Sequence, residues 1–141
     1  MRKIVLILLS FLGVSCGVDP CDFDCSEGPV LVKIVLVDKN TGENLFKNGT
    51  FHRKNLKIKN HDEVVDFLWH DLQYQIILGP FDHQLPKDEY VFFMENRQLF
   101  TLAFRIDEQE EKCCTILSEK EITADGTVLE QNNKGIYQVK L

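Results

Sequence analysis

Short apolar runs separated by turn residues fill the chain from Val30 to the C-terminus, and this pattern restricts the fold more than any other feature. In the run 99–106, every second residue is large and apolar, and Thr101 and Arg105 lie between them. The apolar members are Phe100, Leu102, Phe104 and Ile106. Successive side chains of a strand point to opposite faces, so this run predicts a strand with one face in a core and one in solvent.

Other runs rich in β-branched and aromatic residues predict further strands. They cover residues 30–37, 55–59, 64–69, 73–78, 89–94, 113–117, 127–131 and 136–141. Many short strands with frequent turns are typical of a sandwich or a barrel. We expect an all-β domain over residues 30–141, namely an antiparallel β-sandwich of about seven to eight strands with a transthyretin-like or immunoglobulin-like arrangement.

Two dipeptides in the chain predict turns. Asn48-Gly49 is a strong signal for a hairpin turn, because both residues tolerate positive φ angles. It lies between the apolar run 44–46 and the predicted strand 55–59, so we expect these two runs to form a hairpin. Asp125-Gly126 predicts a second turn, just before the strand at 127–131.

Residues 60–72 fit both a helix and a strand. Asn60 followed by Glu63 resembles a helix capping box, and several apolar residues have helical spacing. These residues are Val64, Val65, Leu68, Trp69 and Leu72. The odd-numbered residues from 65 to 69 are also all apolar, as in a strand. We expect a strand, preceded by a hairpin turn at 60–63.

The N-terminus, MRKIVLILLSFLGVSC, has the order of a secretory signal. Arg2 and Lys3 precede an apolar run at 4–12, which small residues separate from Cys16. This run is shorter than the roughly 18 to 20 residues that span a bilayer, so it does not predict a permanent transmembrane helix. We expect residues 1–15 to be a signal peptide that is removed, and the protein to be exported.

Residues 12–16, LGVSC, resemble the lipobox of bacterial lipoproteins, in which the cysteine receives diacylglycerol before the leader is cleaved in front of it. Gly13 departs from the usual leucine three residues before that cysteine. We expect lipidation of Cys16 and anchoring to the cell envelope, at the outer membrane, facing either the periplasm or the cell surface. Ordinary signal-peptidase cleavage, with Cys16 left as a thiol or a disulfide partner, is the alternative.

Removal of the 15 leader residues, among them Arg2 and Lys3, would leave 126 residues and change the formal charge from −6 to −8. So acidic a chain is not expected to bind nucleic acid or an anionic membrane surface. Residues 17–29 contain two prolines, two glycines and four acids without periodicity. We therefore expect residues 16–29 to be a lipidated N-terminus and tether that leads to the sandwich domain.

The stretch VLVDKNTGENLF at 35–46 resembles the opening hairpin, D-x-x-T-G-E-x-L, of transthyretin-like and carboxypeptidase-regulatory-like β-sandwiches in Bacteroidota envelope proteins. The rest of the chain resembles small lipoproteins of that phylum, which have a lipobox, this turn, and adjacent cysteines near a late strand. The matching residues are Cys16, Asp38, Thr41, Gly42, Glu43, Cys113, Cys114 and the turn Asp125-Gly126. The resemblance implies a lipid-anchored sandwich domain and brings no catalytic residues.

The expected mature chain offers little for catalysis. Its serines are Ser26 and Ser118, and neither lies in a Gly-x-Ser-x-Gly motif. The four histidines are scattered through polar stretches, which predicts surface positions rather than metal ligation. They are His52, His61, His70 and His83. Residues 38–43 imitate a calcium loop, but the glycine is one position early, so we expect a turn. We predict no enzyme, no cofactor and no metal.

Trp69 and Tyr74 are weak candidates for ligand binding, because exposed aromatic rings can stack on sugars. Packing in the core is the alternative for both, since they lie among aliphatic residues in strand-like runs. The acidic run DEQEE at 107–111 could attract a cation or a basic partner. A solvated hairpin end is the alternative, and the one we expect.

With Cys16 assigned to lipid, four cysteines remain for disulfides in an oxidising compartment, which allows three pairings. They are Cys21, Cys25, Cys113 and Cys114. We favour the two arrangements that join the tether to the late strand, each closing a loop of roughly 90 residues worth about 4 kcal/mol in the chain-entropy model. A zinc site and a redox-active pair are alternatives.

Two functions follow from these expectations. The first is a non-catalytic binding or scaffold module, lipid-anchored to the cell envelope, with an envelope protein or a glycan as its partner. The alternative is a thiol-redox or other envelope enzyme that uses Cys113 and Cys114.

Overall fold

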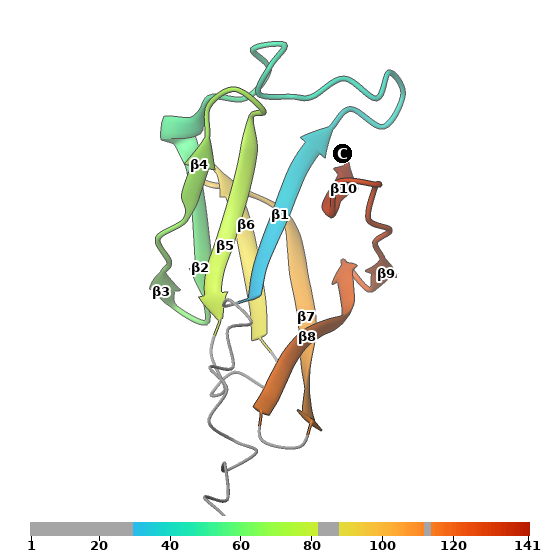
Figure 1. Cartoon of the computed structure of the whole chain (residues 1–141). Coiled ribbons are helices and arrows are strands. Elements are labelled where there is room, and N and C mark those ends of the chain that lie inside the picture. Colours follow the sequence, from blue (N-terminus) through green and yellow to red (C-terminus); the bar gives the residue numbers. More distant parts are fainter. Residues whose placement is uncertain (1–29, 82–87, 112–113) are drawn as a thin grey trace, which may run out of the picture.

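A computed structural model describes residues 30–81, 88–111 and 114–141, which form two β-sheets (Figure 1). The four-stranded sheet contains, in spatial order, β10 (Ile136–Lys140), β1 (Val30–Val37), β5 (Gln75–Phe81) and β4 (Leu68–His70). The six-stranded sheet contains β3 (Glu63–Val64), β2 (Leu56–Asn60), β6 (Asp88–Met94), β7 (Arg97–Glu111), β8 (Cys114–Ala124) and β9 (Thr127–Val128). Within the described residues there is no α-helix, so the all-β prediction is confirmed.

Seven strands have five residues or more, and β3, β4 and β9 have two or three. Neighbouring strands are antiparallel with one exception, because β1 and β10 pair in parallel, with Ile34 opposite Tyr137. The first and last strands of the domain therefore lie side by side. A single 3-10 turn, η1 (Arg53–Asn55), precedes β2.

The inner faces of both sheets contribute to one hydrophobic core. In β1, the side chains of Val32, Ile34 and Leu36 are fully buried, and those between them are more exposed. Direct contacts join the sheets: the ring of Phe81 on β5 lies 4.6 Å from that of Phe104 on β7. The two sheets thus form a β-sandwich whose core lies between them.

The alternation predicted for residues 99–106 is confirmed within β7. Its large apolar side chains are all buried, whereas Arg105 is exposed and Thr101 is half-buried. The ring of Phe100 stacks on that of Phe92 in β6, with 4.4 Å between the ring centroids. The rings of Phe100 and Phe104 therefore both lie on the buried face of the sheet, as a two-residue period requires.

Residues 60–72 contain no helix, as predicted, but the strand expected at 64–69 is divided into two short strands, because β3 ends at Val64 and β4 begins at Leu68. Asn60 pairs with Glu63, so residues 61 and 62 form a two-residue turn between β2 and β3. After β3 the chain crosses to the other sheet and continues as β4. The predicted turn at Asp125-Gly126 is likewise present between β8 and β9.

The hairpin predicted around Asn48-Gly49 is wrong. Gly49 has a φ angle of +82°, as expected in a turn, but the dipeptide lies in a connection between β1 of one sheet and β2 of the other. Leu45 and Phe46, in the run that was expected to pair, are buried in the core instead. Burial of these two side chains at the end of the sandwich replaces strand pairing here.

Candidate functional site

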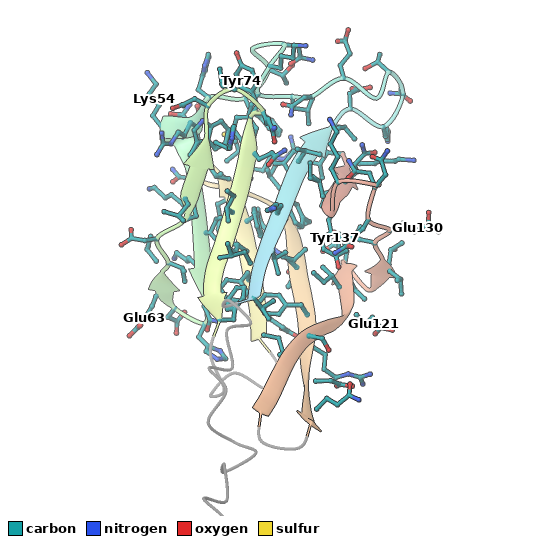
Figure 2. All side chains as sticks on the ribbon, in the orientation of Figure 1. Lys54, Glu63, Tyr74, Glu121, Glu130 and Tyr137 are labelled. Carbon is teal, nitrogen blue, oxygen red and sulfur yellow. The ribbon has the colours of Figure 1, made fainter. Side chains whose placement is uncertain are left out.

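Trp69 and Tyr74 both lie half-buried against the core. The Trp69 ring, on β4, contacts the edge of Phe46 at a centroid distance of 4.9 Å, and the guanidinium of Arg53 lies 5.6 Å from its centre. Tyr74 ends the turn between β4 and β5, near the upper end of the sandwich in Figure 2, with a φ angle of +51°. The structure does not bring the two rings together as an exposed platform, and ligand binding by them stays a prediction.

Large apolar side chains are exposed in the chain segment that contains Trp69. Among the described residues, five large apolar side chains are exposed, and three of them lie within residues 64–72. These three are Val64, Leu68 and Leu72, with exposed fractions of 65%, 58% and 89%. Scattered exposed apolar residues are common on soluble proteins, but three of them within nine residues of the chain make this segment a candidate interaction surface.

Strand alternation explains why Leu68 faces solvent, whereas Leu72 lies in the turn between β4 and β5. Val65, Phe67 and Trp69 pack against the core. The residues between them, Asp66 and Leu68, therefore point outward. The chain crosses from one sheet to the other in this segment, so the outward-facing residues lie along one side of the sandwich.

Four carboxylates accompany the exposed apolar residues: Asp62, Glu63, Asp66 and Asp71, all of which are exposed. Figure 2 shows Glu63 pointing away from the sheets. Within the described part of the chain, none of these carboxylates takes part in an ion pair. The sequence has no lysine or arginine from residue 60 to residue 86. We call this surface, comprising the four acids with Val64, Leu68 and Leu72, the acidic edge.

Both strands at the acidic edge are the last of their sheets. Among the described strands, β4 pairs with β5 alone and β3 pairs with β2 alone (Figure 1). The opposite side of the four-stranded sheet is partly covered, because Gln131 forms a β-bridge with Tyr137 of β10. Edge strands present unpaired N–H and C=O groups to which another strand can add. The acidic edge thus combines open backbone, apolar side chains and negative charge.

A shallow hollow of about 380 Å³ lies on the six-stranded sheet. Ala103 on β7 stands opposite Glu89 on β6 and Thr123 on β8, and its small side chain lowers the floor between them. Arg105 and Glu121, also opposite each other, form part of the wall. Ligand pockets of this size are lined predominantly by hydrophobic and aromatic side chains, whereas five of the seven residues that line this hollow are polar or charged. We therefore regard the acidic edge as the stronger candidate site.

The turn at 38–43 is confirmed, and its first carboxylate, that of Asp38, accepts hydrogen bonds from the backbone of the turn itself. The Oδ1 atom of Asp38 accepts hydrogen bonds from the N–H groups of Asn40 and Thr41, each at 2.8 Å. These bonds, from Thr41 first and then Asn40, hold the pKa of Asp38 below its ordinary value. Of the residues that the structure describes, no three histidine, cysteine or acidic side chains form a group suited to a metal ion.

The predicted sites at Cys16, Cys21, Cys25 and Cys113 lie outside the described residues. Cys114 begins β8, where it pairs with Glu111 near the end of the long β7–β8 hairpin. The acidic run 107–111 forms the last part of β7 beside that hairpin end. Lipidation, the disulfides and thiol chemistry therefore stay predictions.

No protein-family model, curated protein or solved structure matches this chain. The resemblance to transthyretin-like envelope lipoproteins thus stays a prediction as well. In the described ranges, no helix is long and apolar enough to cross a membrane.

Proposed function

We propose that this chain is a non-catalytic binding module, anchored to the outer membrane of the cell envelope by acyl chains on Cys16, which binds a protein partner at the acidic edge. The observation that supports the proposal most is the exposure of Leu68 and Leu72. Leu68 lies on β4 and Leu72 follows it, at the end of the sheet where no described strand pairs with β4. Apolar surface that a partner covers contributes roughly 25 cal/mol per Å² to binding.

A protein suits this surface better than a glycan does. Sugar recognition in sandwich domains relies on exposed aromatic rings, but Trp69 is half-buried between Phe46 and Arg53. The exposed apolar groups of the acidic edge are aliphatic, and the buried centre of a protein interface is more apolar than its rim.

The expected anchor would keep the acidic edge near the envelope. The tether of residues 17–29 spans at most about 45 Å when extended, which restricts the module to partners at or near the same membrane. The acidic balance of the chain also disfavours contact with anionic lipid headgroups. The acidic edge thereby stays accessible to proteins.

Photo-cross-linking tests whether the acidic edge meets a partner. A photoreactive residue would replace Leu72 in the full-length protein, produced in its own cells, and a second version would carry it at Val128. Val128 is a control of the same kind, because it is a large apolar side chain that is 59% exposed, and it lies on β9, at the other end of the six-stranded sheet from β3. We expect discrete adducts from position 72 after irradiation and none above background from position 128.

Equal adducts from both positions, or none from either, would contradict binding at the acidic edge. Gel mobility and mass spectrometry of the adducts distinguish a protein partner from a second copy of the chain. An adduct of two copies through position 72 would also contradict the proposal, since it would make the surface a self-association interface.

A further inference from the structure

We infer that the partner binds the acidic edge as an extended, positively charged segment that adds to β4 as a further strand of the four-stranded sheet. This inference rests on the proposed function and specifies its partner. It follows from three properties of the acidic edge: its open backbone, its unpaired carboxylates and the order of its exposed side chains.

β4 is a short edge strand of three residues, but within it no lysine, proline or bulge blocks the addition of another strand. Natural edges carry lysines, prolines or bulges that prevent the addition of another strand. β4 reads Leu-Trp-His, and its pairing with β5 is regular from Leu68 to His70. Strand addition supplies main-chain hydrogen bonds independently of the partner's sequence, and side chains then determine which partner fits.

The charge at the acidic edge selects a basic segment. Four exposed carboxylates without ion-pair partners in the described structure lie on or beside β3 and β4. A second copy that paired its β4 with this one by two-fold symmetry would bring two sets of these carboxylates together, because such an interface uses the same surface twice. Like charges placed opposite each other destabilise strand pairs, whereas lysine or arginine opposite these acids stabilises them.

The order of exposed side chains specifies the pattern in the partner. Asp66 precedes β4 and Asp71 follows it, so exposed carboxylates lie on both sides of the exposed Leu68. On an added strand, an apolar residue beside Leu68 would lie between basic residues that can reach these carboxylates. The segment we infer thus alternates basic and apolar residues.

The fluorescence of Trp69 can report this binding. It is the single tryptophan of the chain and lies within β4. The full-length protein would be titrated with the peptide KVKLKVK while tryptophan fluorescence is recorded, since the peptide has no aromatic residues. The comparison peptides are EVELEVE, with reversed charge, and KVKPKVK, in which a central proline interferes with strand pairing.

We expect KVKLKVK to bind at least about tenfold more tightly than either comparison peptide, and about 0.5 M salt to weaken its binding, because the contact includes exposed charges. Equal affinity for EVELEVE would overturn the inference that the partner is basic. Equal affinity for KVKPKVK would overturn strand addition. Failure of KVKLKVK to bind would overturn the inference as a whole.

Variants of the protein, each with a matched control, identify the surface that binds the peptide. Leu68→Ser should reduce the affinity for KVKLKVK by about tenfold, as expected for lost burial of a leucine, while Val128→Ser should leave it unchanged. Asp66→Asn should weaken binding and reduce its salt dependence, while Glu130→Gln, at another exposed acid, should do neither. Thermal melting of each variant verifies its fold. Unchanged affinity in both Leu68→Ser and Asp66→Asn would place the peptide elsewhere and overturn the inference.

The two proposals fail in different ways. Protein adducts at position 72 without any binding of KVKLKVK would retain the acidic edge as a binding surface and overturn the basic strand. Absence of adducts at position 72 would overturn the proposed function itself. The inference stands if both experiments succeed and the partner segment found in the adducts is basic.

Discussion

Replacement of Phe92 by alanine should lower the free energy of unfolding by about 3–5 kcal/mol, the range expected for phenylalanine truncation in a core. Phe92 is fully buried on β6, and its ring stacks on Phe100 of β7. The truncation would remove apolar contacts and leave a cavity beside that ring. Domains of this size are stable by only about 5–15 kcal/mol, so denaturant titration should show a large shift of the unfolding midpoint.

Phe93→Ala is the matched control for this prediction. Phe93 follows Phe92 in the same strand but lies half-buried on the opposite face, with the ammonium of Lys59 at 5.6 Å from its ring centre. We expect its truncation to cost about 1 kcal/mol. Equal losses in the two variants would show that the inner face of β6 does not pack as described.

Replacement of Cys16 by serine, together with replacement of residues 1–15 by a leader that is cleaved without lipidation, should transfer the protein from the membrane fraction to the soluble fraction. Each buried methylene of an acyl chain contributes about 0.8 kcal/mol, so several chains on one cysteine anchor a protein stably. Serine has no thiol to receive diacylglycerol, and the variant would lose that anchor. Fractionation by centrifugation, with immunodetection of the full-length chain, measures the transfer.

Cys21→Ser is the control for the anchor, since it removes a neighbouring thiol and retains Cys16. We expect this variant to stay in the membrane fraction. Intact mass spectrometry of the parent protein should give a chain that begins at Cys16 and carries the mass of its acyl groups. An unmodified Cys16, or a membrane-bound Cys16→Ser variant with the replaced leader, would refute lipid anchoring.

Strands and tight turns could be predicted from local sequence because their causes are local. The two-residue alternation in 99–106 appears in the structure as the buried face of β7. The absence of a helix from residues 60–72 followed from the apolar residues at 65, 67 and 69, which pack against the core. Asp125-Gly126 forms its turn because both residues adopt positive φ angles, which aspartate tolerates better than most residues and glycine accepts freely.

The assignment of strands to sheets depended on distant residues and could not be predicted. Asn48-Gly49 has the local chemistry of a hairpin turn, but the connection that contains it joins two different sheets. The parallel pairing of β1 with β10 joins the two ends of the domain, about a hundred residues apart, and no nearby residue signals it.

The acidic edge could be predicted from the sequence only in part. Trp69 was chosen as an aromatic candidate, but the structure directs its ring toward Phe46 and leaves Leu68 exposed. The alternation that identified the buried residues also implied that Asp66 and Leu68 face outward. The signal that could have found this surface is the run of acids among apolar residues, without lysine or arginine, between residues 60 and 72.

Amide hydrogen exchange tests the central claim, that the acidic edge is covered by a partner in the envelope. Exchange at residues 63–70 and at residues 127–128 would be compared between the protein in its native membrane and the purified protein in detergent. We predict slower exchange at 63–70 in the membrane and no difference at 127–128, because a partner strand would protect only the β3–β4 side. Equal exchange at 63–70 in both preparations, or protection confined to 127–128, would contradict the account.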